Sequence, residues 1–341
     1  MLHFDSDYME GAHPKVMERL MATNLEQTTG YGTDSHTLHA RALIREAVGN
    51  PDAEVYFLVG GTQTNATVIA SLLSGCEGVV AAETGHISVH EAGAVEATGH
   101  KVLTIPAKEG KIEAEVLDRY LRDFFADGTY EHMVLPALAY ISQPTEYGTL
   151  YSLSELEEIS ATCHRHGLKL YLDGARLGYA LAAEGNDVTL KDLGRLCDAF
   201  YIGGTKVGAL CGEAVVLKGK GLIPHFFSEI KRHGALLAKG RVLGVQFETL
   251  FSDGLYLECG RHAVSQAMKL KAAFTAAGYT PAIDSPTNQQ FFRLPNPLID
   301  RLSESMTFEY WGPRGDTEST VRFVTSWATT DEAIAALAAA L

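Results

Sequence analysis

Short apolar runs alternate with helical stretches along most of this chain, and this alternation constrains the fold more than any other feature of the sequence. The expected strands are 55–59, 79–82, 102–105, 138–142, 168–172, 199–202 and 213–217. Helical patterns lie among them, at 36–48, 62–73, 113–125 and 152–166. Strands and helices that alternate in this way form a mostly parallel sheet covered by helices. The sequence therefore predicts an α/β fold.

The pattern changes in the last third of the chain. Residues 222–251 read as mostly helical and 255–277 as one long helix, followed by strands near 290–294, 307–311 and 321–326 and a closing helix from Asp331. For 341 residues, two domains are the ordinary expectation. We expect a large α/β domain over 1–250 and a smaller C-terminal α+β domain over 251–341. The N-terminal segment 1–23, whose helix begins at Pro14, is expected to cross between them.

Charge and composition argue against several classes of partner. The formal net charge is −14 and no basic face is visible, so we expect no nucleic-acid partner. No stretch is long and apolar enough to suggest a membrane partner, and the N-terminus does not resemble a signal peptide, which favours a cytoplasmic location. The five cysteines are scattered and odd in number, which favours neither a disulfide framework nor a CxxC metal site.

An acidic residue and a lysine follow two of the expected strands. Asp173 opens the run Asp-Gly-Ala-Arg, and Lys206 closes the run Gly-Gly-Thr-Lys. Open α/β sheets bind ligands at the carboxyl ends of their strands. In an enzyme that uses pyridoxal 5′-phosphate (PLP), a lysine amine bonds to the cofactor aldehyde, and a carboxylate keeps the pyridine nitrogen protonated. A solvated lysine and a plain turn are the alternatives for each residue alone, but their order and placement favour a PLP site.

Two further segments suit the same cofactor. The run Gly60-Gly61-Thr62 offers backbone amides where a strand turns into a helix, which suits a phosphate group. A dinucleotide loop is excluded there because GxGxxG is absent. His86 follows another strand, where its ring could stack on a pyridine. A metal ion shared by His86 and His90 is the alternative, but no third ligand has a fitting spacing, so we expect no metal site.

Taken together, these residues resemble the threonine aldolase and β-eliminating lyase family of PLP enzymes. The resemblance runs over nearly the whole chain. It is carried by Phe-Asp-Ser-Asp at 4–7, Gly-Tyr-Gly at 30–32, Gly61-Thr62, Gly85-His86, Glu-Ala-Gly at 91–93, Asp173 to Arg176, Lys206 and the run 321–327. It implies the aspartate aminotransferase type of fold, which is fold type I of the PLP-dependent enzymes.

The resemblance also implies a role for individual residues. Lys206 is implied to bond to PLP, Asp173 to pair with the ring nitrogen and His86 to stack on the ring. Further cofactor contacts are implied at Gly61, Thr62, Arg176, Thr205 and, reaching the phosphate of a neighbouring subunit, Arg241. A clamp on the carboxylate of an amino acid substrate is implied at Ser6, Arg176 and Arg322, with Tyr31 as a further substrate contact. The expected assembly is a homodimer or homotetramer with active sites at the subunit interface.

The implied activity is cleavage of threonine, allo-threonine or a similar β-hydroxy-α-amino acid to glycine and an aldehyde. Many aldolases carry a second active-site histidine after the strand that here spans 138–142, and in this chain Thr145 or a neighbour takes its place. The group that removes the β-hydroxyl proton is therefore open, with His86 and a phosphate-held water as candidates. β-Elimination from another amino acid is the alternative activity, and a non-catalytic ligand-binding protein is a third interpretation.

Overall fold

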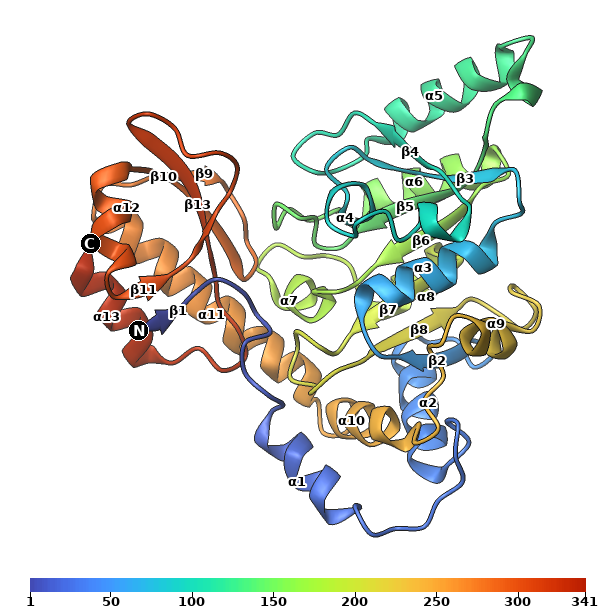
Figure 1. The fold of residues 1–341 in the computed structure, drawn as a ribbon, viewed down its shortest axis with the longest axis horizontal. Helices are drawn as coiled ribbons and strands as arrows, with labels where there is room; N and C mark the ends of the chain where they lie inside the picture. Colours follow the sequence, from blue (N-terminus) through green and yellow to red (C-terminus); the bar gives the residue numbers. More distant parts are fainter.

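The computed structural model describes residues 1–341 and contains a seven-stranded sheet beside a four-stranded one (Figure 1). The large sheet has the order β2 (Glu54–Leu58), β8 (Glu213–Leu217), β7 (Ala199–Gly203), β6 (Lys169–Asp173), β5 (Leu135–Ser142), β3 (Glu77–Ala82) and β4 (Val102–Ile105). Only β8 runs antiparallel to its neighbours. All seven strands expected for this sheet are present, and the predicted mostly parallel α/β architecture is confirmed.

Helices cover both faces of the large sheet. One face packs against α2 (Ser35–Ala47), α5 (Ala114–Ala126), α6 (Leu153–Arg165), α8 (Leu190–Leu196) and α10 (Arg241–Phe251). The other face packs against α3 (Gly61–Leu72) and α9 (Phe226–Arg232). Side chains alternate along a strand, so Leu170 and Leu172 of β6 join the first cluster and Tyr171 joins the second. Both faces are therefore apolar, as the continuous apolar runs of the sequence require.

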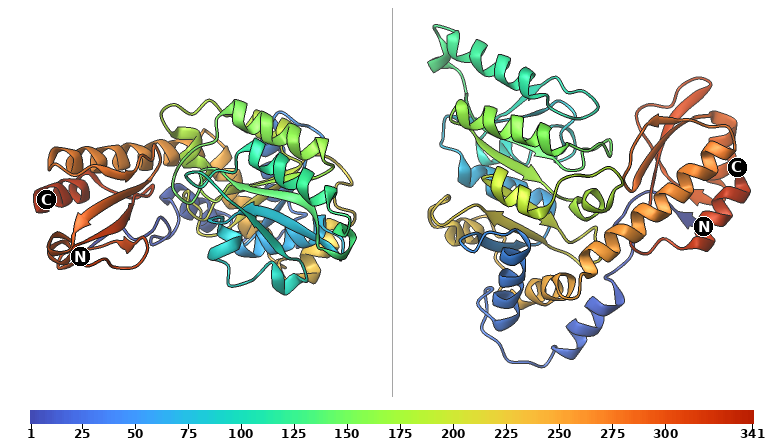
Figure 2. Two further views of the ribbon diagram at one scale, coloured as in Figure 1. Left: turned by 90° about the horizontal axis from the view of Figure 1, so that it is seen from above. Right: turned by 180° about the vertical axis from the view of Figure 1, so that it is seen from behind.

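The C-terminal part of the chain forms the smaller sheet, drawn in orange and red in Figure 1. Its antiparallel order is β12 (Glu309–Tyr310), β13 (Glu318–Val324), β10 (Gln289–Pro295) and β9 (Pro281–Ile283). The helices of this part are α11 (Leu255–Ala276), α12 (Asn296–Ser303) and α13 (Asp331–Ala340). Figure 2 shows α11 running from this sheet toward the large one, where it packs against α7 (Leu177–Ala182). We propose the same division near residue 250, because α10 and α11 meet there.

The N-terminal segment touches both parts of the molecule. Strand β1 (Leu2–His3) pairs in parallel with β11 (Met306–Thr307), and α1 (Pro14–Ala22) packs against α10. The remaining short elements are α4 (His86–Val89) and the 3₁₀ turns η1 (Glu96–Thr98) and η2 (Tyr130–His132). None of the helices combines the length and the apolar character that crossing a bilayer requires.

In the second half of the chain, one expectation holds with an interruption and one is wrong. Residues 222–251 are mostly helical as expected, since the seven residues of α9 and the eleven of α10 make up 18 of the 30. The two helices are separate because α9 ends near Gly234, whose φ of +68° is incompatible with a helix, and α10 begins only at Arg241. The single strand expected at 307–311 is two short strands in different sheets, since β11 pairs with β1 and β12 pairs with β13. The error at 307–311 concerns a segment whose pairing is set by distant strands rather than by its local apolar pattern.

We predict that Gly244→Ala destabilises the protein by about 1–3 kcal/mol through overpacking. Gly244 lies where α10 crosses α2, and a Cβ there would stand 2.3 Å from Oγ1 and 2.7 Å from Cα of Thr37. This clash exceeds the gain in helix propensity of about 1 kcal/mol. Urea unfolding measures the difference, with Gly75→Ala as the control, because a Cβ at Gly75 meets no atom within 4 Å. Unchanged stability in Gly244→Ala would contradict the close helix contact.

Candidate active site

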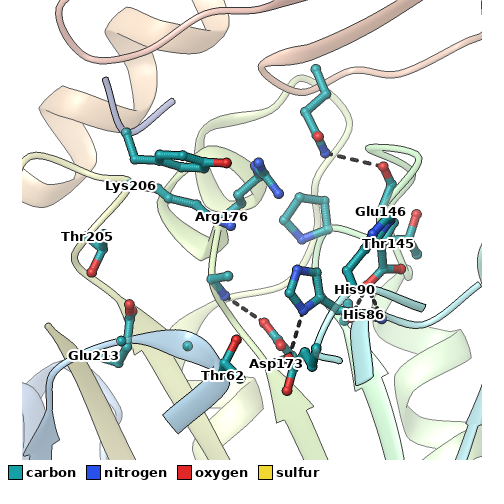
Figure 3. A pocket seen from close by; sticks show the side chains of 18 of the residues that line it. Thr62, His86, His90, Thr145, Glu146, Asp173, Arg176, Thr205, Lys206 and Glu213 are labelled. Atoms are coloured by element: carbon teal, nitrogen blue, oxygen red, sulfur yellow. Dashed lines mark hydrogen bonds and ion pairs between the residues drawn. The ribbon is translucent and has the colours of Figure 1, made fainter. Parts of the chain in front are cut away.

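A cavity of about 510 Å³ opens at the carboxyl ends of β5, β6 and β7 (Figure 3). The C-terminal part closes one side of it with Gln289, Glu309, Trp311 and Arg322. The cavity brings together eight residues that the sequence singled out: Gly61, Thr62, His86, Asp173, Arg176, Thr205, Lys206 and Arg322. These residues come from opposite ends of the sequence, so the fold and not local sequence assembles them.

Asp173 ends β6 and lies buried at the floor of the cavity. The hydroxyl of Tyr140 donates to its Oδ2 at 2.6 Å, and that of Tyr201 donates to Oδ1 at 2.5 Å. The Asn65 amide adds a third side-chain hydrogen bond to Oδ2 at 3.0 Å. Burial alone would raise the pKa of Asp173, but His86 and these donors outweigh it and lower the pKa below its ordinary value. Asp173 is therefore ionised at neutral pH.

Lys206 follows β7, and its amine enters the cavity from the side opposite His86 (Figure 3). Its Nζ lies 5.8 Å from the centre of the Tyr8 ring. Burial of the amine, together with the nearby charge of Arg176, lowers the pKa of Lys206. A lowered pKa raises the fraction of neutral, nucleophilic amine at physiological pH. Lys206 is thus suited to attack a carbonyl carbon.

Glu213, the first residue of β8, is a second buried carboxyl group in the cavity. Its Oε2 accepts a hydrogen bond from the backbone N–H of Gly204 at 3.2 Å. Burial raises the pKa of Glu213 to about 8, although the positive charge of Lys206 opposes that shift. Glu213 is therefore mostly protonated at neutral pH.

The first turn of α3 forms another wall of the cavity. The residue before the helix, Gly60, offers no side chain to cap it, so the first-turn N–H groups of Gly61 and Thr62 have no side-chain acceptor. Thr205, which also lines the cavity, accepts a hydrogen bond from the Gly212 N–H at 2.9 Å with its hydroxyl. An uncapped helix start with neighbouring hydroxyl groups is suited to binding an anion such as phosphate.

His86 begins α4 and has a fixed ring orientation. Its Nδ1 lies 2.7 Å from Oε1 of the buried Glu91, and this carboxylate favours a proton on Nδ1. The ring of His90 also lines the cavity, with its centre 5.6 Å from that of His86. No group of three or more His, Cys, Asp or Glu side chains is arranged to hold a metal ion.

Arg176 is held by a buried ion pair with Asp7. Its Nε lies 2.7 Å from Oδ2 of Asp7, and its Nη2 lies 3.0 Å from Oδ1. The Asn288 amide also donates to Asp7, at 2.9 Å. Burial would raise the pKa of Asp7, but the positive charge of Arg176 lowers it below the ordinary value. The resulting bidentate pair fixes the guanidinium plane at the cavity wall.

Arg322 of β13 approaches from the C-terminal part. Its Nη1 donates to the Gln289 side chain at 2.8 Å, and its Nη2 contacts the Glu309 carboxylate. The guanidinium also lies over the Trp311 ring, 5.1 Å from its centre. Its Nε is buried and has no partner. Two guanidinium groups, from different parts of the chain, therefore face the cavity.

Three of the residues that the sequence singled out lie outside the cavity of the single chain. Ser6 is buried beside it but does not line it. Tyr31 lies on the surface with Nζ of Lys231 4.7 Å from its ring centre. The Arg241 guanidinium donates to the backbone oxygens of Asn24 and Glu26. The role implied for Arg241 concerns a second subunit, so it stays a prediction.

Several functional groups in the cavity escaped the sequence reasoning. Tyr140 and Tyr201 had a usable signal, because they lie on the same face of strands that flank β6. Glu213 had a weaker sequence signal, because it is an acidic residue at the start of an otherwise apolar strand. Trp311 and Glu146 line the cavity from loops or short strands, and no local pattern marks them.

We predict that Asp7→Asn lowers the free energy of unfolding by about 3–5 kcal/mol at pH 7, because it leaves a buried guanidinium unpaired. The pKa of Asp7 in the folded protein is lowered, so its contribution is present above the unfolded value of about 4 and is lost as pH falls further. The gap between variant and wild type should therefore narrow at pH 3. Denaturant unfolding at both pH values measures it.

The exposed pair of Glu157 and Arg195, 2.8 Å apart, supplies the control. Glu157→Gln should change stability by less than about 1 kcal/mol. A similar loss in both variants would mean that the Asp7 pair is no more buried in solution than an ordinary surface pair.

Comparison with known proteins places this cavity in a family. The family model of the β-eliminating lyases matches residues 3–293. The low specificity L-threonine aldolase of Pseudomonas aeruginosa is 30% identical over 339 residues, which cover 98% of this chain and 95% of that protein.

Solved structures agree with this assignment. A threonine aldolase from Leishmania major superposes with a TM-score of 0.96 at 44% identity, covering 99% of this chain and 98% of the other. Aspartate aminotransferase from Thermus thermophilus, at 15% identity, has a TM-score of 0.70, covering 100% of this chain and 92% of that one. The expected aspartate aminotransferase type of fold is confirmed, and the chain belongs to the β-eliminating lyase family of enzymes.

Proposed function

We propose that this enzyme is a PLP-dependent aldolase that cleaves threonine, allo-threonine and similar β-hydroxy-α-amino acids to glycine and an aldehyde. The observation that carries the proposal is one cavity in which the Lys206 amine, the ionised Asp173 and two arginines meet. The relatives from Pseudomonas and Leishmania, both named threonine aldolases, support the choice of substrate.

The donor set of the cavity fits PLP at each end. The uncapped start of α3 at Gly61 and Thr62, together with Thr205, would hold the phosphate. Lys206 would hold the aldehyde carbon, and the Asp173 carboxylate matches a protonated ring nitrogen. When bound, PLP supplies an electron-accepting ring for the bond that breaks at Cα.

The two arginines would orient the amino acid substrate. A guanidinium matches a carboxylate through paired donors, and Arg322 and Arg176 both line the cavity. The Glu309 carboxylate that now contacts Arg322 shows that the guanidinium accepts a carboxylate partner in this position. Ser6, implied by the family resemblance, remains a proposed third member of the clamp.

A second copy of the chain would complete the phosphate end. The single chain contributes no lysine or arginine there besides Lys206, Arg176 and Arg322. Large hydrophobic side chains are exposed on and around α1, among them Met17, Met21, Leu25 and Tyr31. These features support a homodimer or homotetramer in which Arg241 and Tyr31 act on a neighbouring cavity. A cytoplasmic location is also proposed, in keeping with five free cysteines.

A substrate panel tests the activity directly. Purified protein loaded with PLP is given threonine, allo-threonine, phenylserine, serine and cysteine, and glycine, aldehyde and pyruvate are measured together. Glycine with an equal amount of aldehyde supports the aldolase. Pyruvate in place of glycine would instead indicate β-elimination, and no glycine from any β-hydroxy amino acid would exclude aldolase activity.

We predict that Lys206→Ala abolishes covalent attachment of PLP and lowers cleavage by about a thousandfold or more, because its amine is the proposed attachment point. Borohydride reduction followed by peptide mass spectrometry should place the label on Lys206 in the wild type and on no lysine in the variant. Lys220→Ala, at an exposed position, is the control and should remain fully labelled. Label on another lysine in the wild type would refute the assignment.

A further inference from the structure

Glu146 lies in the turn after β5, within the cavity wall near His86 (Figure 3). The Ser142 hydroxyl donates to its Oε1 at 2.8 Å, and the backbone N–H of His86 donates to the same oxygen at 3.0 Å. Both donors hold one carboxylate oxygen, and the other accepts no hydrogen bond from the protein. The geometry therefore fixes the carboxylate while leaving one oxygen available to a ligand.

The neighbouring Thr145 is engaged elsewhere. Its hydroxyl lies 2.6 Å from that of Thr149 and also accepts the Tyr147 N–H at 3.2 Å. These bonds close the turn, and a hydroxyl group is not a base at neutral pH. Of the two adjacent residues in this turn, only Glu146 has a side chain able to take up a proton.

The surroundings of Glu146 make it a stronger base than an exposed carboxylate. Burial raises its pKa, and the negative charge of Asp173 on β6 acts in the same direction. A hydrogen bond with its own backbone, the Ser142 hydrogen bond and the positive charge of His86 on α4 lower the pKa without cancelling the rise. The other titratable groups that face it are the phenols of Tyr140 on β5 and Tyr151 before α6. A carboxylate whose pKa is raised toward the working pH suits general base catalysis.

We propose that Glu146 is the general base that accepts the β-hydroxyl proton of the substrate. The inference rests on the proposed aldolase function and assigns the base that removes the β-hydroxyl proton, which the sequence left open. The substrate O–H bond breaks and its proton passes to the free oxygen of Glu146. The oxygen electron pair forms the aldehyde C=O bond while the Cα–Cβ bond breaks, and its electron pair stays on the Cα side. Protonation of Cα then gives glycine, and Glu146 releases its proton to water.

The two histidines of the cavity are less suited to this step. Nδ1 of His86 is bound to Glu91, and the ring has the proposed task of stacking on the cofactor. His90 is exposed, and the centre of its ring lies 6.4 Å from that of Trp311. Glu146, in contrast, is buried and lies close enough to Asp173 for the two charges to interact.

The test compares Glu146→Gln with the wild-type holoenzyme. We expect kcat for threonine cleavage to fall by about 10²- to 10⁴-fold. PLP absorbance, the Kd for glycine and exchange of the glycine α-proton in D₂O should stay within about threefold, because none of them needs a β-hydroxyl base. The acid limb of the wild-type kcat profile, where activity is lost as pH falls and Glu146 is protonated, should be absent in the variant.

Three further variants sharpen the result. Glu146→Asp and Glu146→His each keep a base in the turn and should recover at least tenfold over Glu146→Gln, the second with an acid limb nearer the imidazole range of about 6.5. Glu115→Gln, exposed on α5, should behave as wild type. His90→Asn should retain most activity.

The outcomes separate this inference from the proposed function. Cleavage by Glu146→Gln at a rate near wild type overturns the inference alone, and loss in His90→Asn with an unaffected Glu146→Gln moves the role to His90. If Glu146→Gln also loses PLP, glycine affinity and α-proton exchange, the role of Glu146 is structural, and this result overturns the inference too. If the wild type releases no glycine from any β-hydroxy amino acid, the proposed function itself fails.

Discussion

A buried carboxylate that must stay ionised governs the architecture of the cavity. An unpaired charge at the depth of Asp173 would cost several kcal/mol, so the fold has to supply donors around it. The order β7-β6-β5 does this, because it sets Tyr201 and Tyr140 on the two strands that flank β6. Helix α3 brings Asn65 from the covering layer. The strand order of the sheet is therefore what stabilises the charge of Asp173. The same order places Lys206, which follows β7, near that carboxylate.

The charges that line the cavity also explain how an acidic protein accommodates an anionic ligand. Three basic side chains stand among a larger number of acidic ones, and each guanidinium group has a carboxylate partner: Asp7 for Arg176 and Glu309 for Arg322. Such pairing keeps the guanidinium groups oriented when no substrate carboxylate is present. An amino acid, which carries both signs of charge, fits a surface of this kind better than a simple anion would.

Local signals in the sequence were enough for the large sheet and for the residues at its strand ends. Asp173 and Lys206 were predictable because each follows an apolar run directly, and strand ends in a parallel sheet share one edge. Glu309 and Trp311 were not, since their place in the cavity depends on how the smaller sheet packs against the larger one. Glu146 was passed over because a carboxylate in a turn looks like an ordinary solvated residue until the chain around it is folded.

The contacts of Asp7 link the two parts of the molecule that enclose the cavity. Its carboxylate is shared between Arg176, which follows a strand of the large sheet, and Asn288, which precedes β10 of the small one. Strand β1, a few residues earlier, is paired with β11 and so is joined to the C-terminal part. Any hinge motion that separates the C-terminal part from the large sheet therefore has to stretch the buried hydrogen bonds of the Asp7 carboxylate. Opening of the cavity is therefore coupled to the ion pair between Asp7 of the N-terminal segment and Arg176. A solute that weakens ion pairs would make the cavity easier to open and would also destabilise the fold.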